Sequence, residues 1–275
     1  YYQLVNASRS FQGARPIPVP SEAKTIDIGA GAEQWSDVAP YFAAYIGNTG
    51  HRDARGYGSK YYTEFSGRND IVGARVARDG SYTDGYVYFF VECAENISPY
   101  TDPLWMNVYL DVDGREGGWE SFDYVINKTS PKSESVAVLE RFTGNGYESE
   151  AVAAIKYSVQ GRYLQLEIPK SALGIEGDEF TLNFAVTDNV HDEDDQAKNN
   201  NKNYVYTRFS GDILDFYTAG DVAPGGRFKY SFMAKADKLP ATSEPITEPA
   251  ESENSGCGSL AATPLAAVIP AAVVI

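Results

Sequence analysis

A series of short apolar runs, separated by Gly, Asn, Asp and Pro, most strongly constrains what this chain can fold into. In Tyr163–Ile168 and Phe180–Thr187 every second residue is apolar. Because successive side chains of a strand point to opposite faces, this alternation predicts strands with one face on a core. Strands are predicted at Lys24–Ile28, Ile71–Arg78, Tyr86–Cys93, Trp105–Asp111, Phe122–Asn127, Ser135–Phe142, Ala151–Val159, Tyr163–Ile168, Phe180–Thr187 and Arg227–Phe232.

Strands this short and this regularly interrupted predict an all-β fold. The expected architecture is an antiparallel β-sandwich of jelly-roll or immunoglobulin-like type, with very little helix. Helical signals are confined to Gln34–Tyr45 and to one turn at Lys170–Leu173, where Pro169 precedes and Gly174 follows. Since strands and helices do not alternate along the chain, the pattern excludes a parallel nucleotide-binding sheet.

Composition divides the chain into four parts. Residues 1–23 form a leader whose prolines favour an extended conformation, and residues 24–236 carry the predicted sandwich. Residues 237–255 are rich in Pro, Ser, Thr and Glu, which predicts a flexible spacer. Residues 256–275 form an apolar tail whose continuously nonpolar part, Leu260–Ile275, is shorter than a spanning helix needs. With the acidic spacer before it, this tail resembles the anchoring tail of a bacterial surface protein without its basic end. We therefore expect a truncated membrane or cell-wall anchor.

The net charge of -15 and the pI near 4.5 limit the partners. Phosphate recognition needs clustered Lys and Arg, so we expect no nucleic-acid partner. Cys93 and the tail residue Cys257 leave the predicted sandwich without an internal disulfide. The chain begins at Tyr1 rather than Met, so we expect a monomeric domain of a larger, extracellular protein, secreted or anchored to a bacterial surface.

The segment Tyr100–Asn127 carries the clearest binding signal, because its first strand has one apolar face and one face of rings and polar groups. Sugar C–H faces stack on indole and phenol rings while polar neighbours take the hydroxyls. Within this segment the candidate carbohydrate-binding residues are Trp105, Asn107, Tyr109, Arg115, Trp119 and Glu120. For each tryptophan alone, the alternative is a cap on the sandwich, and Trp35 is expected in the core.

Carboxylates surround the glycine-rich turn of the same segment. Hard oxygen ligands at this density predict a structural calcium site, formed by Asp111, Asp113, Glu120 and Asp123. The spacing differs from an EF-hand loop, since Gly114 comes too early and Arg115 takes a ligand position. An acidic turn without an ion is the alternative, and the acidic run Asp188–Asp195 is expected to be a solvated loop.

The order of these motifs resembles the family-9 carbohydrate-binding modules and their DOMON-like relatives. The similarity runs through VYFFVECAENISPYTD, WMNVYLDVDG, GWESFDYVIN, RYLQLEIPKSALG and TLNFAVTDN, from about Ile26 to Phe232. It implies a β-sandwich fused to glycan-degrading enzymes, in some cases with calcium. The family grips sugar between two rings, and since no tryptophan follows Trp119, the later ring would be Phe209, Phe216 or Tyr217. The long insert Gly47–Ile71 is expected to shape or cover the site.

The sequence thus predicts a non-catalytic module that binds a plant or microbial polysaccharide or oligosaccharide, within a glycan-degrading surface protein. One alternative is a glycoside hydrolase or its accessory domain, with Asp111, Glu120 or Asp123 as working carboxylates. Another is a structural spacer domain without a ligand. A last alternative is a haem-binding DOMON-like domain, whose axial ligands would come from His51, Met106, His191 and Met233.

Overall fold

The structure of the chain is a computed structural model. The structure describes residues 20–56, 60–193, 201 and 203–234. The chain divides into two units, Tyr1–Leu239 and Pro240–Ile275, and every described residue belongs to the first. Most of the predicted leader, together with the predicted spacer and apolar tail, lies outside the described residues.

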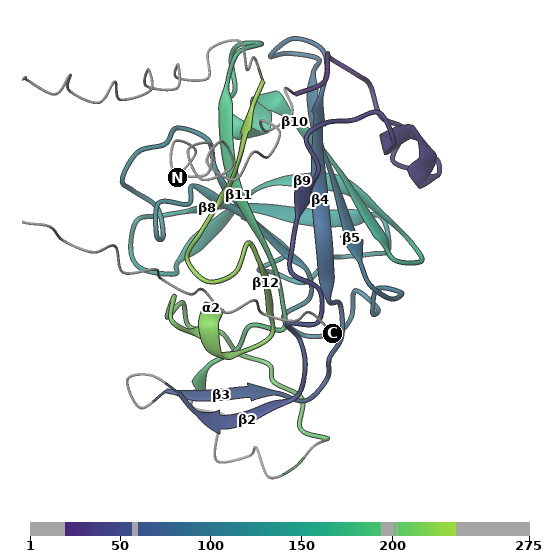
Figure 1. Ribbon diagram of the computed structural model, residues 1–275. Helices are drawn as coiled ribbons and strands as arrows, with labels where there is room; N and C mark the ends of the chain where they lie inside the picture. Colours follow the sequence, from purple (N-terminus) through teal and green to yellow (C-terminus); the bar gives the residue numbers. More distant parts are fainter. Residues whose placement is uncertain (1–19, 57–59, 194–200, 202, 235–275) are drawn as a thin grey trace, which may run out of the picture. The chain divides into compact units, whose positions relative to one another are not determined.

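Nearly all regular structure in the described residues is β-strand (Figure 1). One large antiparallel sheet has the order β1 (Phe42–Ala43), β4 (Ile71–Arg78), β5 (Tyr86–Cys93), β10 (Tyr163–Pro169), β9 (Ser149–Gln160), β8 (Val136–Phe142), β7 (Tyr124–Ile126), β6 (Asn107–Asp111), β11 (Thr181–Asp188) and β12 (Asp221–Ala223). In addition, β11 pairs with β13 (Tyr230–Met233), and a separate two-stranded sheet consists of β2 (Arg52–Arg55) and β3 (Tyr61–Glu64). Helical turns occur at η1 (Ala32–Trp35), η3 (Lys170–Leu173) and α2 (Asp215–Thr218).

The large sheet curls so that strands far apart in this order come together. Strands β10, β9, β8, β7 and β6 lie between β5 and β11 in the sheet, yet the rings of Phe89 and Phe184 contact each other at 5.3 Å between centroids. Phe42 on β1 meets the same Phe184 ring at 5.1 Å. The result is a sandwich-like all-β architecture, which confirms the predicted fold class.

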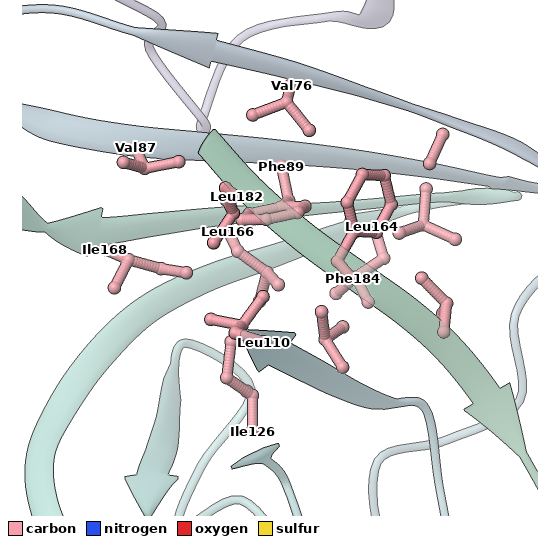
Figure 2. Packing of buried hydrophobic residues seen from close by; sticks show 14 of the residues in the cluster. Val76, Val87, Phe89, Leu110, Ile126, Leu164, Leu166, Ile168, Leu182 and Phe184 are labelled. Atoms are coloured by element: carbon pink, nitrogen blue, oxygen red, sulfur yellow. The ribbon is translucent and has the colours of Figure 1, made fainter. Parts of the chain in front are cut away.

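The inner core fills the space enclosed by the curled sheet (Figure 2). The predicted apolar faces of β10 and β11 both point into it, as do the alternate residues of β6. Its members include Val76, Val87, Phe89, Met106, Val108, Leu110, Ile126, Leu164, Leu166, Ile168, Leu182 and Phe184. Burial of these aliphatic and aromatic side chains is the main favourable contribution to folding.

The sequence-based boundaries match the observed ones for two strands and differ by one or more residues for the others. The predicted and observed bounds of β4 and β5 agree, whereas Lys24–Ile28 forms no strand ladder. That segment packs its isoleucines beside Trp35 on the outer face of the sheet instead. The predicted helical stretch Gln34–Tyr45 overlaps η1 only at Gln34 and Trp35 and contains β1. The short strands of the insert and β12 were not anticipated. No helix among the described residues is long and apolar enough to cross a membrane.

Candidate functional site

The rings predicted to form a sugar platform are buried. Trp105 is 2% exposed, Tyr109 0% and Trp119 4%, and the neighbouring Asn107 is 7% exposed. The predicted exposure of this surface is therefore wrong. The two tryptophans are buried for different reasons.

Trp105 belongs to the inner core because the alternation of β6 starts later than expected. Leu104 and Met106 both have positive φ, 56° and 41°, so the backbone turns immediately before the strand. The indole of Trp105 packs at 5.7 Å from the Tyr157 ring, and its Nε1 donates to the carbonyl of Ser98 at 2.8 Å. Trp105 and Met106 consequently both enter the core, although a regular strand would separate them.

Trp119 and Tyr109 do lie on the outer face of the sheet, but the segment after β11 covers them. We call this group the covered ring cluster, formed by Tyr109, Trp119, Phe122, Phe142, Tyr147, Phe209 and Phe216. Trp119 contacts Phe209 at 6.0 Å and Phe216 at 5.7 Å, and its Nε1 donates to the carbonyl of Gly211 at 3.0 Å. Phe209, one of the rings predicted to grip sugar, therefore closes a second hydrophobic core.

The remaining predicted carbohydrate residues lie at the surface beside this cluster. Glu120 pairs with the guanidinium of Arg227 at 3.1 Å, and the Tyr217 hydroxyl accepts from the backbone N–H of Arg227 at 3.2 Å. Tyr217 is 43% exposed, and Arg115 is also exposed. The structure thus brings Glu120 and Tyr217 together around Arg227, away from the other predicted rings.

Three of the four predicted calcium ligands come together. One carboxylate oxygen each from Asp111, Asp113 and Asp123 lies within 4.8 Å of the others, whereas Glu120 turns to Arg227. Burial raises the pKa of Asp123, and the charges of Asp113 and Asp111 raise it further. The group fits a calcium ion poorly, because the buried Asp111 carboxylate already pairs with the ammonium of Lys229 at 3.0 Å.

A ring-lined pocket lies at another part of the molecule, between the part of the insert that follows β3 and the segment that follows β11. Its volume is about 250 Å³. Rings from both segments line it, together with hydroxyl, amide and guanidinium groups: Phe65, Ser66, Arg68, Asn189, Asn203, Tyr204, Val205 and Tyr206. The insert therefore does shape a cavity, as expected of a segment of that length.

Each wall of the pocket has an aromatic pair behind it. On the insert side, Phe65 packs edge-on against His51 at 4.9 Å. On the opposite side, Tyr206 stacks flat on His191 at 3.5 Å, and Tyr204 meets Tyr206 edge-on at 5.1 Å. These contacts fix the ring orientations, so the pocket is formed without a bound ligand.

Buried charges support the floor of the pocket. The guanidinium Nε of Arg68 donates to the buried carboxylate of Asp188 at 2.8 Å, Nη2 donates to the Pro103 carbonyl at 2.6 Å, and Nη1 lies 3.4 Å from Asp102. Burial raises the pKa of Asp188, and the Arg68 charge opposes that rise. Because acidic partners compensate its charge, Arg68 acts here as a structural residue.

Asn189 is held in place by a second buried carboxylate. Its Nδ2 donates to Glu64 at 3.0 Å, and Glu64 is 1% exposed. Ser66 donates to the same carboxylate through its backbone N–H at 2.6 Å. The polar groups at the pocket wall are therefore fixed by hydrogen bonds from behind, which keeps them in position for a ligand.

The insert and the segment after β11 are also tied together directly, and β2 and β3 lie next to α2 (Figure 1). The Lys60 ammonium reaches Asp212 at 2.7 Å, Glu193 at 3.1 Å and Asp215 at 3.2 Å. Burial is the main cause that raises the pKa of Asp215 to about 6. This clasp holds the two walls of the pocket against each other.

Sequence reasoning missed the later wall of this pocket. The run Asp188–Asp195 was expected to be a solvated loop, but Asp188, His191 and Asp192 are 0%, 1% and 6% exposed. Residues 194 and 195 lie outside the described residues. The available signal was the alternation Tyr204-Val205-Tyr206, which places two rings on one side of an extended segment.

The candidate haem ligands do not gather at this pocket. Met106 is part of the inner core, and His191 stacks on Tyr206 behind the pocket wall. Neither residue lines the cavity, and the same is true of His51 and Met233.

Comparison of the chain with protein-family models, with curated proteins and with solved structures finds no match. The resemblance to family-9 carbohydrate-binding modules and DOMON-like domains therefore stays a prediction from the order of motifs along the sequence.

Proposed function

We propose that this chain is a non-catalytic carbohydrate-binding module whose sugar site is the ring-lined pocket. The observation that supports this proposal is that Phe65 and Tyr204, both partly exposed, line one small cavity that also carries hydroxyl and amide groups. Tyr206 lines the same cavity but is only 4% exposed, and it supports the Tyr204 ring from behind. Rings supply faces for the C–H groups of a sugar. The hydroxyl of Ser66 and the side-chain amide of Asn189 both donate to Glu64, and their oxygens are the groups that would accept from a sugar hydroxyl. Carbohydrate binding is also the role predicted from the sequence, but the proposed site lies at the insert and the segment after β11 and not at the β6 hairpin.

The charges around the pocket favour a neutral sugar residue. Arg68 is the cationic side chain of the lining, and its guanidinium already faces Asp188 and Asp102. The carboxylate of Glu64 lies buried behind Asn189. The carboxylate of an acidic sugar would be repelled by these negative charges, and no unpaired cation in the lining would compensate it. A neutral sugar is therefore the better match.

Binding without catalysis agrees with the partners of the carboxylates that a hydrolase would use. Asp111 pairs with Lys229, and Glu120 pairs with Arg227. A glycosidase needs one carboxylic acid and one carboxylate facing a common cleft, and the ring-lined pocket has no acidic side chain among its lining residues. We also propose that the module acts outside the cell beside a glycan-degrading enzyme, which rests on the composition of the tail and on the family resemblance.

The test is a glycan array on the full chain, followed by titration calorimetry on the best neutral oligosaccharide. We expect wild type to bind and Tyr204→Ala to lose binding at unchanged secondary structure. Tyr204→Phe keeps the ring and should retain most of the affinity. Absence of binding to every neutral and acidic glycan on the array would refute the proposed function and favour a structural spacer domain.

A further inference from the structure

We infer that Lys229 takes the place of a metal ion at the junction of β6 with its hairpin, so that this strand junction is held by an internal ammonium group and needs no calcium. The sequence places a dense group of carboxylates at this turn, and such groups generally need a cation nearby. The structure supplies that cation from the chain itself, on the turn that precedes β13.

The surroundings of the ammonium have the donor set of a cation site. Lys229 Nζ donates to Asp111 Oδ2 at 3.0 Å and to the carbonyl of Ser121 at 2.7 Å. The same atom lies 4.1 Å from the centroid of the Phe122 ring, where the π-electrons attract a positive charge. A carboxylate, a backbone carbonyl and a ring face therefore converge on one nitrogen.

Asp111 has little capacity left for a metal. Its Oδ1 accepts from the N–H of Gly114 at 2.8 Å, and its Oδ2 accepts from Asn183 Nδ2 at 3.1 Å as well as from Lys229. The Asp111 side chain is 5% exposed. A calcium ion bound to this carboxylate would have to displace a lysine whose side chain is 20% exposed and already hydrogen-bonded.

The other two carboxylates of the group are used to shape the turn. Asp123 Oδ2 accepts from the N–H of Val112 at 2.8 Å, and Asp113 Oδ1 accepts from the N–H of Arg115 at 2.9 Å. The Asp113 bond is a local one, typical of a carboxylate that stabilises a turn, and the Asp123 bond joins the two arms of the hairpin. Lys229 thus connects a hairpin of β6 and β7 to a segment more than a hundred positions later, which is the connection a structural calcium ion would otherwise provide.

The experiment measures the thermal midpoint of the full chain in excess calcium and in excess chelator. We expect the wild-type midpoint to be the same in both, to within about 1 °C. Lys229→Met leaves Asp111 buried without its partner, and we expect its midpoint in chelator to fall by roughly 5–10 °C. Calcium should restore a measurable part of that loss.

Two control variants separate this effect from the general loss of a lysine. Lys156→Met removes the exposed pair with Glu167 at 2.8 Å and should give no calcium response. The double variant Asp111→Asn/Lys229→Met removes both charges and should lose the calcium response of Lys229→Met. If Lys229→Met does not fold in either condition, calorimetric titration of wild type with calcium tests the inference instead. Wild type should then show no calcium binding.

A calcium-stabilised wild type would overturn the inference, and so would a Lys229→Met variant that responds to calcium no more than Lys156→Met. Neither outcome bears on sugar binding, because the ring-lined pocket uses other segments of the chain. A failed glycan array would likewise leave the role of Lys229 intact.

Discussion

The covered ring cluster and the ring-lined pocket are built from the same connecting segment, yet they have opposite characters. Tyr204 and Tyr206 face a cavity of about 250 Å³, whereas Phe209, three residues further on, packs onto Trp119 at 6.0 Å. Both regions are rich in rings, and only the pocket leaves space in front of them. The comparison teaches that aromatic content identifies where rings gather, while the opposing surface decides whether they bind a ligand or fill a core.

The two regions also differ in what holds them together. The covered ring cluster is closed by apolar contacts and by the hydrogen bond from Trp119 to Gly211. The pocket is backed by buried charges, among them Glu64 and Asp188 with the guanidinium of Arg68. Truncation of a side chain should therefore affect the cluster most, while pH should affect the region behind the pocket.

The largest effect is expected from Trp119→Ala. This change removes a 4% exposed indole from the covered ring cluster and should lower the free energy of unfolding by about 3–5 kcal/mol. Urea unfolding monitored by circular dichroism measures it, with Tyr45→Ala as the control, since Tyr45 is 80% exposed. If Trp119→Ala were as stable as wild type, the indole would not be part of a core. The covered ring cluster would then be an open surface and would not differ from the ring-lined pocket in this respect.

A smaller change in stability should follow pH through Asp221, which lies at the end of β12 and accepts hydrogen bonds from the N–H groups of Ile71 and Val222. Burial is the main cause that raises its pKa from 3.8 to about 7. The folded state therefore holds the proton more tightly than the unfolded state, so this contribution to stability is present at low pH and lost as pH rises through about 7.

Between pH 5 and pH 8 we expect the free energy of unfolding to fall by on the order of 3 kcal/mol from this group. Urea unfolding at both pH values measures the difference, and Asp221→Asn should remove most of it. If the pH dependence of stability persists in Asp221→Asn, other groups cause it. Asp215, which pairs with Lys60, would then be the next residue to substitute.

A third effect concerns affinity rather than stability. Tyr204→Ala should weaken sugar binding about fivefold or more, because a stacked ring contributes on the order of 1 kcal/mol or more to such a contact. Calorimetry on the glycan found by the array measures it. Equal affinity in wild type and Tyr204→Ala would show that the sugar binds elsewhere. The ring-lined pocket would then not be the binding site that distinguishes it from the covered ring cluster.

The smallest effect is expected from Tyr217→Ala. This ring is 43% exposed and lies beside Arg227, outside both the pocket and the covered ring cluster. We expect a loss of at most about 1 kcal/mol in stability and a change in sugar affinity below about twofold. A loss of binding as large as that of Tyr204→Ala would return the site to the surface predicted from the sequence.

The sequence predicted the architecture well where strands are long and central. The bounds of β4 and β5 and the inward faces of β10 and β11 follow from alternation, because every second side chain must leave water. Trp35 is in a core as expected, 1% exposed and hydrogen-bonded to Gln165. Short edge strands carry too few alternating residues to be recognised, and the strands of the insert were missed for that reason.

None of the predicted carbohydrate-binding residues lines the ring-lined pocket. Glu120 and Tyr217 are at the surface, and the insert does shape a cavity, whereas the assigned platform rings are buried. Trp105 entered the core because it lies before β6, where Leu104 and Met106 have positive φ and turn the backbone, while the alternation of β6 itself is as predicted. No short-range pattern shows that Phe209 and Phe216 return to cover Trp119 from about ninety positions away.

Local composition and periodicity therefore determined the fold class, the inner core and the density of carboxylates at the β6 hairpin. Each follows from residues a few positions apart, whose relation is set by the geometry of a strand or a turn. Only the tertiary structure decided which rings are covered and which line a pocket, and which cation the carboxylates meet. These depend on contacts between distant segments, such as Trp119 with Phe216 and Asp111 with Lys229, that form when the sheet curls.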